Sequence, residues 1–334
     1  MPTFEKRWVF CFSELMYNCI MRKNGDMRKA KGNKKDEFYT QYDNIFDEMT
    51  YYKDEFKGAV VACPCDDYNL SNFCKFFEDV REEWGIKKLI FTSYPDGKYR
   101  IIDDNEVKDG ILDGNGDYRS DEVQELIKDS DIIVTNPPFS LFKEFIIWVV
   151  NSGKRFSILG QGVSIFVKEI FELYKKNLIW FGKHRNIAMT FQVPDDYDTK
   201  IVIDDKKYCK VACSWWTNFG EGQEKEKPFD TGVSYNPNNY RKYDNFDALH
   251  VKTRNDIPMD YDGLMGVSAS YLDVRNDDVF EIVGLFNNYK ETDVEKGLYV
   301  GEKRKVDVGT KIISFGGPIM DGKALFGRIL IKKK

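Results

Sequence analysis

The 334-residue chain lacks several features that mark common classes of protein. It has no run of about 18 apolar residues, so the sequence predicts no membrane-spanning helix. The apolar run Trp8–Phe12 is followed by Glu14 and by no small-residue cleavage site, which argues against a signal peptide. The seven cysteines, an odd number in a long chain, are typical of a reducing compartment. These features predict a cytoplasmic protein.

Histidine is scarce, with two residues in the whole chain. The close pairs Cys63/Cys65 and Cys209/Cys213 have a spacing that some metal sites use. Both pairs lie in apolar, strand-like runs with few histidines to complete a ligand set. We therefore interpret these cysteines as buried thiols and predict no metal site.

A glycine-rich phosphate-binding turn is also missing. The first apolar strand, Ala59–Cys65, ends in Asp66 and Asp67 before a helix that starts near Ser71. The absence of a dinucleotide or P-loop pattern there argues against nicotinamide cofactors and ATP. Carboxylates at a strand end can accept hydrogen bonds from an ammonium group or a ribose hydroxyl. We therefore predict a cofactor without phosphates, S-adenosylmethionine, held near Cys65, Asp66 and Asp67; the alternative is that the carboxylates only cap the following helix.

The net charge of −5 does not favour nucleic-acid binding, but the distribution of charge matters more than its sum. Residues 1–35 form a basic N-terminal extension, which fits a phosphate-binding arm and a solvated arm about equally well. Its basic residues crowd one short segment: Arg22, Lys23, Arg28, Lys29, Lys31, Lys34 and Lys35. Aromatic residues continue into the polar second half, where a core alone would not require them: Tyr235, Tyr240, Tyr243 and Phe246.

Helical and strand-like patterns alternate between residues 36 and 219. Helices are predicted over Asp36–Phe56, Ser71–Trp84, Asp121–Lys128, Leu141–Asn151 and Ser164–Lys176. Strands are predicted over Ala59–Cys65, Lys88–Tyr94, Ile132–Thr135, Phe156–Leu159 and Leu178–Phe181, with an edge hairpin at Tyr99–Asp103. This order predicts an α/β domain with a parallel sheet covered on both faces.

The pattern changes after about Lys183. Two strands, Ile201–Ile203 and Val211–Trp216, are joined by a charged turn, and a long loop follows over residues 220–245. Further strand-like runs are Val267–Leu272, Phe280–Leu285, Lys311–Phe315 and Leu325–Ile331. We therefore predict a cofactor-binding catalytic domain over residues 36–219 and a β-rich C-terminal region over residues 220–334.

The most informative stretch is Ile132–Ser140, where an apolar strand ends at Asn136-Pro137-Pro138-Phe139. Two prolines cannot continue a central strand because they lack the N–H group that the ladder needs. In open α/β sheets, ligands bind at the carboxyl ends of strands. The Asn136 side-chain oxygen and the Pro137 carbonyl can each accept an N–H from an amine on a planar ring, and Phe139 can stack on that ring. Asn136–Phe139 is therefore the candidate catalytic turn; the alternative is a strand that simply ends in a proline turn.

Two other clusters point to the same region. Residues 35–41 open the first helix, and residues 114–120 form a turn before the helix that leads to the catalytic strand. Asp117 in that turn can hold the adenine amine of the cofactor. Either cluster can also be ordinary capping or turn chemistry.

Four sequence segments then occur in a characteristic order: Asp36–Gln41, Cys65–Asp67 with Ser71–Phe73, Gly116–Glu122, and Thr135–Ser140. The ordered set resembles the EcoRI-type adenine-specific DNA methyltransferases of restriction–modification systems and phage genomes, over roughly residues 28–331. The chain departs from the family at Pro64, where Asn is expected, and at Tyr68, where Pro is expected.

The resemblance implies a class I S-adenosylmethionine-dependent methyltransferase (Rossmann-like) sheet with a β-rich C-terminal target-recognition region. It implies that Phe38, Tyr39 and Thr40 line the methionine end of the cofactor and that Asp66 and Asp67 border it. The substrate would be the exocyclic amino group of adenine in double-stranded DNA, flipped out of the duplex. The setting would be the cytoplasm of a bacterial cell or phage-infected host, and a cognate restriction endonuclease would be the partner enzyme.

Three alternatives stay open. The same turn serves enzymes that methylate RNA bases or a protein glutamine amide, although the large loop-rich second half favours a reader of duplex DNA. A DNA-binding protein with an inactive methylase fold is the second alternative, which the intact Asn136–Phe139 turn disfavours. The third is a purely structural α/β protein.

Overall fold

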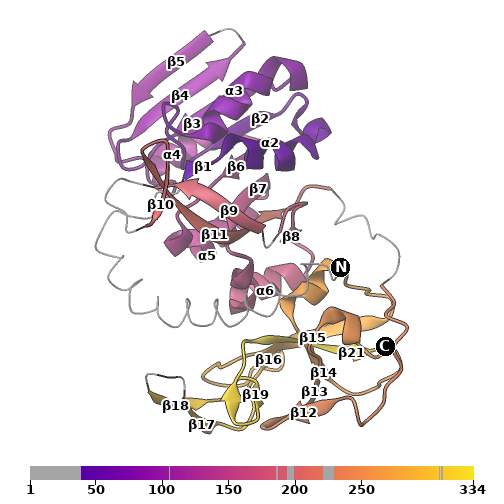
Figure 1. Ribbon diagram of the computed structural model, residues 1–334. Coiled ribbons are helices and arrows are strands. Elements are labelled where there is room, and N and C mark those ends of the chain that lie inside the picture. The colour runs from indigo at the N-terminus through magenta and orange to yellow at the C-terminus, as the bar shows by residue number, and fades with distance from the viewer. Residues whose placement is uncertain are drawn as a thin grey trace. The chain divides into compact units, whose positions relative to one another are not determined.

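The structure is a computed structural model that describes residues 39–104, 106–185, 187–193, 199–220, 229–307, 309 and 311–334. The basic N-terminal extension and Phe38 lie outside the described residues. The chain divides into two compact units, with the described residues of Gly32–Glu224 in one and those of Lys225–Lys334 in the other. Each unit has its own sheets (Figure 1).

The first unit is built on a mixed sheet with the strand order β1-β9-β11-β7-β6-β2-β3-β4-β5, with β8 and β10 paired to β11. Its strands are β1 (Tyr39–Thr40), β2 (Val60–Cys63), β3 (Lys88–Thr92), β4 (Lys98–Asp103), β5 (Glu106–Ile111), β6 (Ile132–Thr135), β7 (Arg155–Gly160), β8 (Trp180–Phe181), β9 (Ile187–Gln192), β10 (Ile201–Ile203) and β11 (Lys206–Thr217). The neighbours β7, β6, β2 and β3 are parallel, as the sequence predicted. Both flanks are antiparallel. Short hairpins, which allow no other pairing, join β3 to β4 and β10 to β11.

Helices cover both faces of this sheet, as predicted. They are α2 (Tyr42–Thr50), α3 (Asn72–Trp84), α4 (Asp121–Ile127), α5 (Phe142–Asn151) and α6 (Lys168–Lys175), with short 3-10 helices η2 (Lys53–Phe56) and η4 (Gly162–Phe166). Neighbouring residues of β11 show the two faces, since side chains alternate along a strand. Trp215 packs against Phe73 of α3, whereas Trp216 packs against Phe142 of α5.

Two predicted helices are divided in the structure. The helix predicted over Asp36–Phe56 is strand β1 followed by α2 and η2 in the described residues, because Tyr39–Thr40 pairs with β9. The helix predicted over Ser164–Lys176 breaks at Val167, whose backbone is extended. Strand β9 itself was not predicted.

The second unit contains a six-stranded sheet with the order β12-β13-β14-β21-β15-β16 and two separate strand pairs, β17–β18 and β19–β20. The strands are β12 (Arg241–Tyr243), β13 (Phe246–His250), β14 (Met265–Val267), β15 (Phe280–Phe286), β16 (Leu298–Tyr299), β17 (Arg304–Asp307), β18 (Ile312–Phe315), β19 (Ile319–Met320), β20 (Lys323–Ala324) and β21 (Arg328–Lys333). The predicted strand Val267–Leu272 is wrong, because β14 ends at Val267 and the 3-10 helix η6 (Ala269–Asp273) follows. Tyr243 and Phe246 belong to the core of this unit.

A buried glutamate ties α2 to the segment between β8 and β9. Glu48 is fully buried and accepts hydrogen bonds from the backbone N–H groups of Lys183 (2.9 Å) and His184 (2.8 Å). Its carboxylate also lies 2.8 Å from His184 Nδ1, and this hydrogen bond raises the pKa of His184. A Cβ atom on Gly182 would lie 2.1 Å from Glu48 Oε1, so the carboxylate occupies the space that a side chain there would need. This contact holds α2, and with it β1, in place.

A second buried carboxylate ties two strand ends to the start of a helix. Asp66 follows β2 and is 5% exposed. Its Oδ1 accepts from Ser71 Oγ (2.6 Å), its Oδ2 accepts from Thr135 Oγ1 (2.5 Å), and its backbone N–H donates to Thr92 O (2.9 Å). Ser71 is the N-cap of α3 and accepts from the N–H of Phe73 (3.1 Å). Burial raises the pKa of Asp66 to about 6, although the two hydroxyl donors act to lower it.

Replacing Asp66 with Asn tests this buried carboxyl. The pKa of Asp66 rises from an ordinary 3.8 to about 6 on folding. The wild-type protein should therefore lose stability as the pH rises between about 4 and 6, because the folded state binds the proton more tightly than the unfolded state. Asn does not titrate, so the free energy of unfolding of Asp66→Asn, measured by urea denaturation, should increase by roughly 2 kcal/mol relative to that of the wild type between pH 4 and pH 6.

The exposed Asp129 supplies the matched control, as Asp129→Asn. A difference between Asp66→Asn and the wild type that stays constant from pH 4 to pH 6 would contradict the raised pKa.

Candidate active site at the carboxyl ends of β2, β3 and β6

The chain leaves the sheet at Asn136, directly after β6, as the sequence predicted. Pro137 is buried, and Asn136, Pro138 and Phe139 are half-buried. Pro138 has an extended backbone (φ −53°, ψ 127°), and its carbonyl accepts a 2.9 Å hydrogen bond within the 3-10 helix η3 (Phe139–Leu141). A rigid turn therefore holds the Asn136 carboxamide at the carboxyl end of the central sheet.

The aromatic residue of the turn is packed on the antiparallel flank. The Phe139 ring meets the Phe191 ring of β9 edge to face, with 6.1 Å between centroids and 89° between planes. Phe191 is the register partner of Thr40 in β1. The Thr40 carbonyl accepts from Asn72 Nδ2 at 2.7 Å, at the start of α3. The predicted cofactor residues Tyr39 and Thr40 are thus brought beside the catalytic turn by β9.

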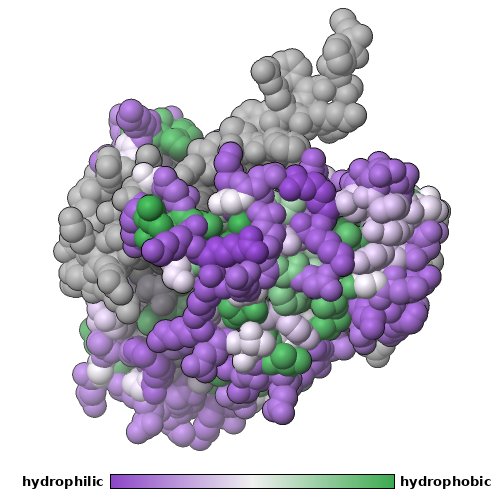
Figure 2. Space-filling view, turned by 90° about the horizontal axis from the view of Figure 1, so that it is seen from below, coloured by the Kyte–Doolittle hydropathy of each residue, from purple (hydrophilic) through white to green (hydrophobic). Residues whose placement is uncertain are grey.

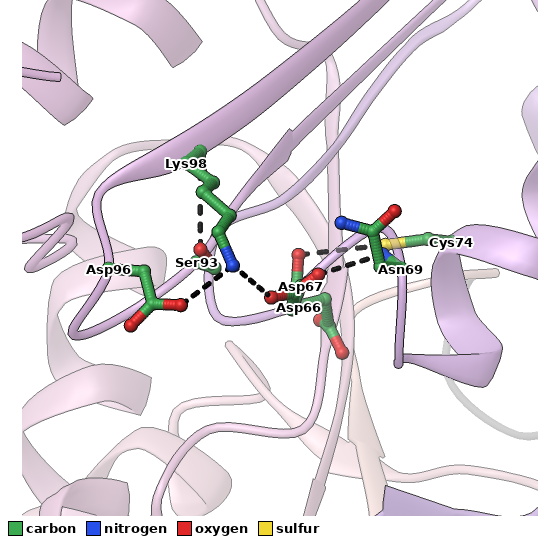
Figure 3. A network of polar contacts seen from close by, with 7 residues as sticks. All are labelled: Asp66, Asp67, Asn69, Cys74, Ser93, Asp96 and Lys98. Atoms are coloured by element: carbon green, nitrogen blue, oxygen red, sulfur yellow. Dashed lines mark hydrogen bonds and ion pairs between the residues drawn. The ribbon is translucent and has the colours of Figure 1, made fainter. Parts of the chain in front are cut away.

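The acidic end of β2 is linked to the end of β3 by a lysine (Figure 3). Asp67 is half-buried, and its Oδ1 accepts from the N–H of Asn69 at 2.7 Å. Lys98 Nζ lies 2.8 Å from Asp96 Oδ2 and 3.5 Å from Asp67 Oδ2. The hydrogen bond that Lys98 donates to Asp96, followed by the charge of Asp67, raises the pKa of Lys98. The two carboxylates and the one ammonium leave this edge of the sheet with a net negative charge.

The turn before α4 comes close to the same strand ends. Gly116 has φ +79°, and a Cβ atom there would lie 1.9 Å from Ser93 O, so the approach requires glycine. The next residue, Asp117, is paired with Arg119 (Nη2 to Oδ2, 2.6 Å), and this hydrogen bond lowers the pKa of Asp117. Burial, together with the negative charges of Asp66 and Asp117, raises the pKa of the Cys65 thiol.

The structure therefore assembles the predicted site residues along one edge of the sheet, with Phe38 alone outside the described residues. Further residues of this edge were not predicted as site residues: Ser71, Asn72, Asp96, Lys98, Thr135 and Phe191. A serine before an amphipathic helix is an N-cap signal that could have identified Ser71. Lys98 and Phe191 depend on strand register, which the sequence alone does not show.

A hollow of about 440 Å³ lies at the opposite edge, lined in part by Val60, Lys88 and Asp131 at the amino ends of strands. It contains none of the predicted site residues, and ligands of such sheets bind at the carboxyl ends. We therefore do not assign it to the reaction.

The described part of the chain bears on two features that the sequence argues against, a metal site and a membrane-spanning helix. No group of three or more His, Cys, Asp or Glu side chains there is arranged to hold a metal ion. No helix there is long and apolar enough to cross a bilayer. The interpretation as buried thiols is confirmed for Cys63, Cys209 and Cys213, whereas Cys65 is a free thiol that is only half-buried, because it follows the end of β2.

Comparison with known proteins identifies the family. The family model described as "Adenine-specific methyltransferase EcoRI" matches residues 26–106 and 95–334. The type II methyltransferase M.EcoRI of Escherichia coli is 35% identical over 337 residues, which cover 92% of this chain and 96% of the relative. The type II methyltransferase M.MpnI of Mycoplasma pneumoniae is 36% identical over 322 residues, covering 92% and 97%. M.MgeORF184P of Mycoplasma genitalium is 35% identical over 321 residues, covering 92% and 98%.

No solved structure matches the chain. The family match spans both units, and it agrees with the ordered sequence segments and with their assembly at one edge of the sheet. The chain belongs to the EcoRI-type family of adenine-specific DNA methyltransferases.

Proposed function

We propose that this chain transfers the methyl group of S-adenosylmethionine to the exocyclic amino group of an adenine that is flipped out of double-stranded DNA. One observation carries the proposal: the Asn136–Phe139 turn at the end of β6 lies beside the acidic end of β2, joined to it by the Thr135–Asp66 hydrogen bond. The oxygens of Asn136 and Pro137, which can accept from an amine, and the aspartates after β2, which can bind a cofactor, then belong to one site.

The strand order supports a class I methyltransferase sheet. The chain passes from β2 outward to β3, then returns to the other side of β2 as β6 and continues outward to β7. The direction of winding therefore reverses between β2 and β6. Ligands of open α/β sheets bind at such a switch point, outside the carboxyl ends of the strands. We assign residues 36–219 to catalysis and the β-rich residues 220–334 to target recognition.

The residues at this edge fit S-adenosylmethionine, whose sulfonium and ammonium groups are cationic. Asp67 offers a half-buried carboxylate at the end of β2. Asp117, whose carboxylate is paired with Arg119, would hold the adenine amine of the cofactor rather than a cationic group. Asp66 has both carboxylate oxygens engaged by hydroxyls, so its part is to border the pocket and to position Asp67. Tyr39 and Thr40, together with Phe38, would line the methionine end.

The chemistry requires orientation more than a strong base. When bound, S-adenosylmethionine supplies an electrophilic methyl group on sulfur. The Asn136 Oδ1 and the Pro137 carbonyl would each accept a hydrogen bond from one N–H group of the adenine amine. These two hydrogen bonds would turn the nitrogen lone pair toward the methyl carbon. Phe139 would stack on the base. The N–C bond forms as the C–S bond breaks, and one N–H proton then leaves to solvent, so most of the rate gain comes from positioning.

Duplex DNA is preferred over RNA or a protein amide as the substrate. The relatives that match 92% of this chain are named type II methyltransferases, and the match includes the second unit. A second unit of more than a hundred residues is large for a peptide or single-base site, whereas a duplex offers a long surface to contact.

Incubation with labelled S-adenosylmethionine tests the substrate directly. Duplex DNA of mixed sequence, RNA and a glutamine-containing peptide are offered separately, and the products are digested to nucleosides or amino acids. Label is expected in N6-methyladenine from DNA. Label confined to RNA or peptide would contradict the proposal, and mapping of the modified adenines would give the recognised sequence.

Asn136→Ala tests the acceptor role of the catalytic turn. Loss of the carboxamide removes one of two acceptors that orient the amine, so kcat should fall roughly 100-fold or more at saturating DNA and cofactor. The Kd for S-adenosylmethionine should stay within about twofold, because Asn136 contacts the substrate rather than the cofactor. The exposed Asn151 at the end of α5 provides the control variant Asn151→Ala. Near wild-type kcat for Asn136→Ala would refute the assigned role.

Asp67→Asn tests the cofactor edge. Removing a carboxylate that accepts hydrogen bonds from a cationic ligand should raise the Kd for S-adenosylmethionine about tenfold and leave kcat at saturation nearly unchanged. Isothermal titration calorimetry measures the first effect and steady-state kinetics the second. An unchanged Kd would remove Asp67 from the cofactor site, and Asp129→Asn again serves as the control.

A further inference from the structure

The second unit offers few elements that fit a DNA groove. Within its described residues, the helical segments are two 3-10 helices, η5 (Arg254–Asp256) and η6 (Ala269–Asp273). Neither resembles the α-helices that usually read the major groove. A two-stranded β-ribbon fits the same groove, and the pair β17–β18 has that form.

We call strands β17 and β18, with the adjoining Lys303 and Lys311, the β17–β18 ribbon. Its two strands form a sheet of their own, outside the six-stranded sheet. They are paired from Arg304 opposite Phe315 to Asp307 opposite Ile312. The ribbon lies at the margin of the second unit (Figure 1). It is therefore an accessible element rather than part of the main sheet.

The inner face of the ribbon and its base are firmly held. Val306 and Phe315 are buried in a small apolar cluster with Ile319. At the base, the N–H of Gly316 donates to Asn288 Oδ1 at 2.8 Å, and the Gly316 carbonyl accepts from the N–H of Gly301 at 2.7 Å. A ribbon fixed in this way can meet a partner with little loss of backbone freedom.

The outer face is polar and exposed, with one apolar side chain. Lys305 is opposite Ser314, and both are exposed. Ile312 is 69% exposed, although it lies in a strand. Its register partner Asp307 accepts from the N–H of Gly309 at 2.7 Å, so that carboxylate is engaged within the turn. Ile312 is therefore an apolar side chain on the outer face that is accessible to a partner.

The charge of this region opposes that of the whole chain. Residues 302–316 contain four basic and two acidic residues, and residues 287–334 contain eleven basic and six acidic residues, whereas the chain carries −5. The acidic Glu302 is paired with Arg304 at 2.9 Å, and Lys303 Nζ donates to the carbonyl of Lys290 at 3.0 Å. Lys305 and Lys311 complete the set of exposed cations. The local excess of positive charge matches a polyanion.

The surface pattern also fits a nucleic acid better than a second protein chain. Figure 2 shows a face that is largely hydrophilic, on which apolar side chains gather in small patches between polar ones. Stable protein interfaces need larger continuous apolar areas, whereas protein–DNA interfaces are polar and basic.

We propose that the β17–β18 ribbon enters the major groove of duplex DNA. Lys303, Lys305 and Lys311 contact phosphates on the groove walls, and Ile312 and Ser314 face the base edges. An apolar side chain can pack on a thymine methyl group, and a hydroxyl can donate to or accept from any base. The inference rests on the proposed function, since it takes duplex DNA as the substrate.

The double variant Lys305→Ala/Lys311→Ala tests the phosphate contacts. Binding to duplex DNA should weaken by roughly tenfold to a hundredfold at low salt, about equally for target and non-target sequences. The slope of log K against log salt concentration should become shallower by about 2, because two phosphate contacts are lost. Fluorescence anisotropy across a salt series measures both quantities, and calorimetry should show unchanged binding of S-adenosylmethionine.

The control double variant is Lys108→Ala/Lys206→Ala, which removes two exposed strand lysines from β5 and β11, outside the basic region 287–334. It should keep the wild-type affinity and slope. Wild-type affinity and slope in Lys305→Ala/Lys311→Ala would overturn the ribbon proposal, and adenine methylation by the wild-type enzyme would leave the proposed function standing. A wild-type enzyme that transfers no methyl group to duplex DNA would overturn both.

Ile312→Ala and Ser314→Ala test the base contacts separately, once methylation mapping has given the target sequence. Each variant should lower kcat/KM on the target duplex about tenfold or more while leaving non-specific affinity unchanged. Both residues are exposed, so folding should not suffer. Unchanged discrimination between the target and single-base variants in both proteins would overturn the placement of these side chains at base edges.

Discussion

The hydrogen bond between Thr135 and Asp66 is the interaction on which the rest of the site depends. It joins the ends of β2 and β6 at the point where the winding of the sheet reverses. Asp67 is one residue from Asp66, and Asn136 is one residue from Thr135. One short contact therefore fixes both the carboxylate edge and the carboxamide of the catalytic turn. A buried carboxylate is costly unless it is hydrogen-bonded, and here two hydroxyl donors offset part of that cost, although burial still raises the pKa of Asp66 to about 6.

The same contact explains why the usual glycine-rich turn can be absent. In dinucleotide-binding sheets, glycines let the backbone approach a pyrophosphate. This chain instead follows β2 with Cys63-Pro64-Cys65 and two aspartates, and Asp66 turns inward to cap α3 through Ser71. Both carboxylate oxygens of Asp66 thereby accept from hydroxyl groups, and the half-buried Asp67 lies at the end of β2.

The parts of the fold that depend on local sequence were predictable, and the parts that depend on pairing across the sheet were not. The bounds of β6 were predicted correctly, because a β-branched run and two prolines define both of its ends. Strand β1 has two residues, too few for an alternating pattern, and the neighbouring aromatic residues match helical spacing. The run after Val267, Ser268–Leu272, alternates small polar and apolar residues over too few positions for its sequence to separate a strand from a 3-10 helix. Lys98, the first residue of β4, lies beside Asp67 only because of the register of the β3–β4 hairpin, which the sequence does not show.

Acidic residues gather at the proposed cofactor edge in the first unit, and basic residues are in excess in residues 287–334 of the second unit. This division suits a reaction between a cationic cofactor and an anionic substrate. An acidic edge at Asp67, Asp96 and Asp117 favours a cationic cofactor but repels the phosphates of the substrate. At physiological ionic strength, charges more than about 8 Å apart are largely screened from one another. Phosphate contacts are therefore best placed on a different element from the cofactor edge. The excess of positive charge in residues 287–334 lies in the second unit, whereas the acidic edge lies in the first. The overall charge of −5 conceals this division, which is why composition alone did not indicate a DNA-binding protein.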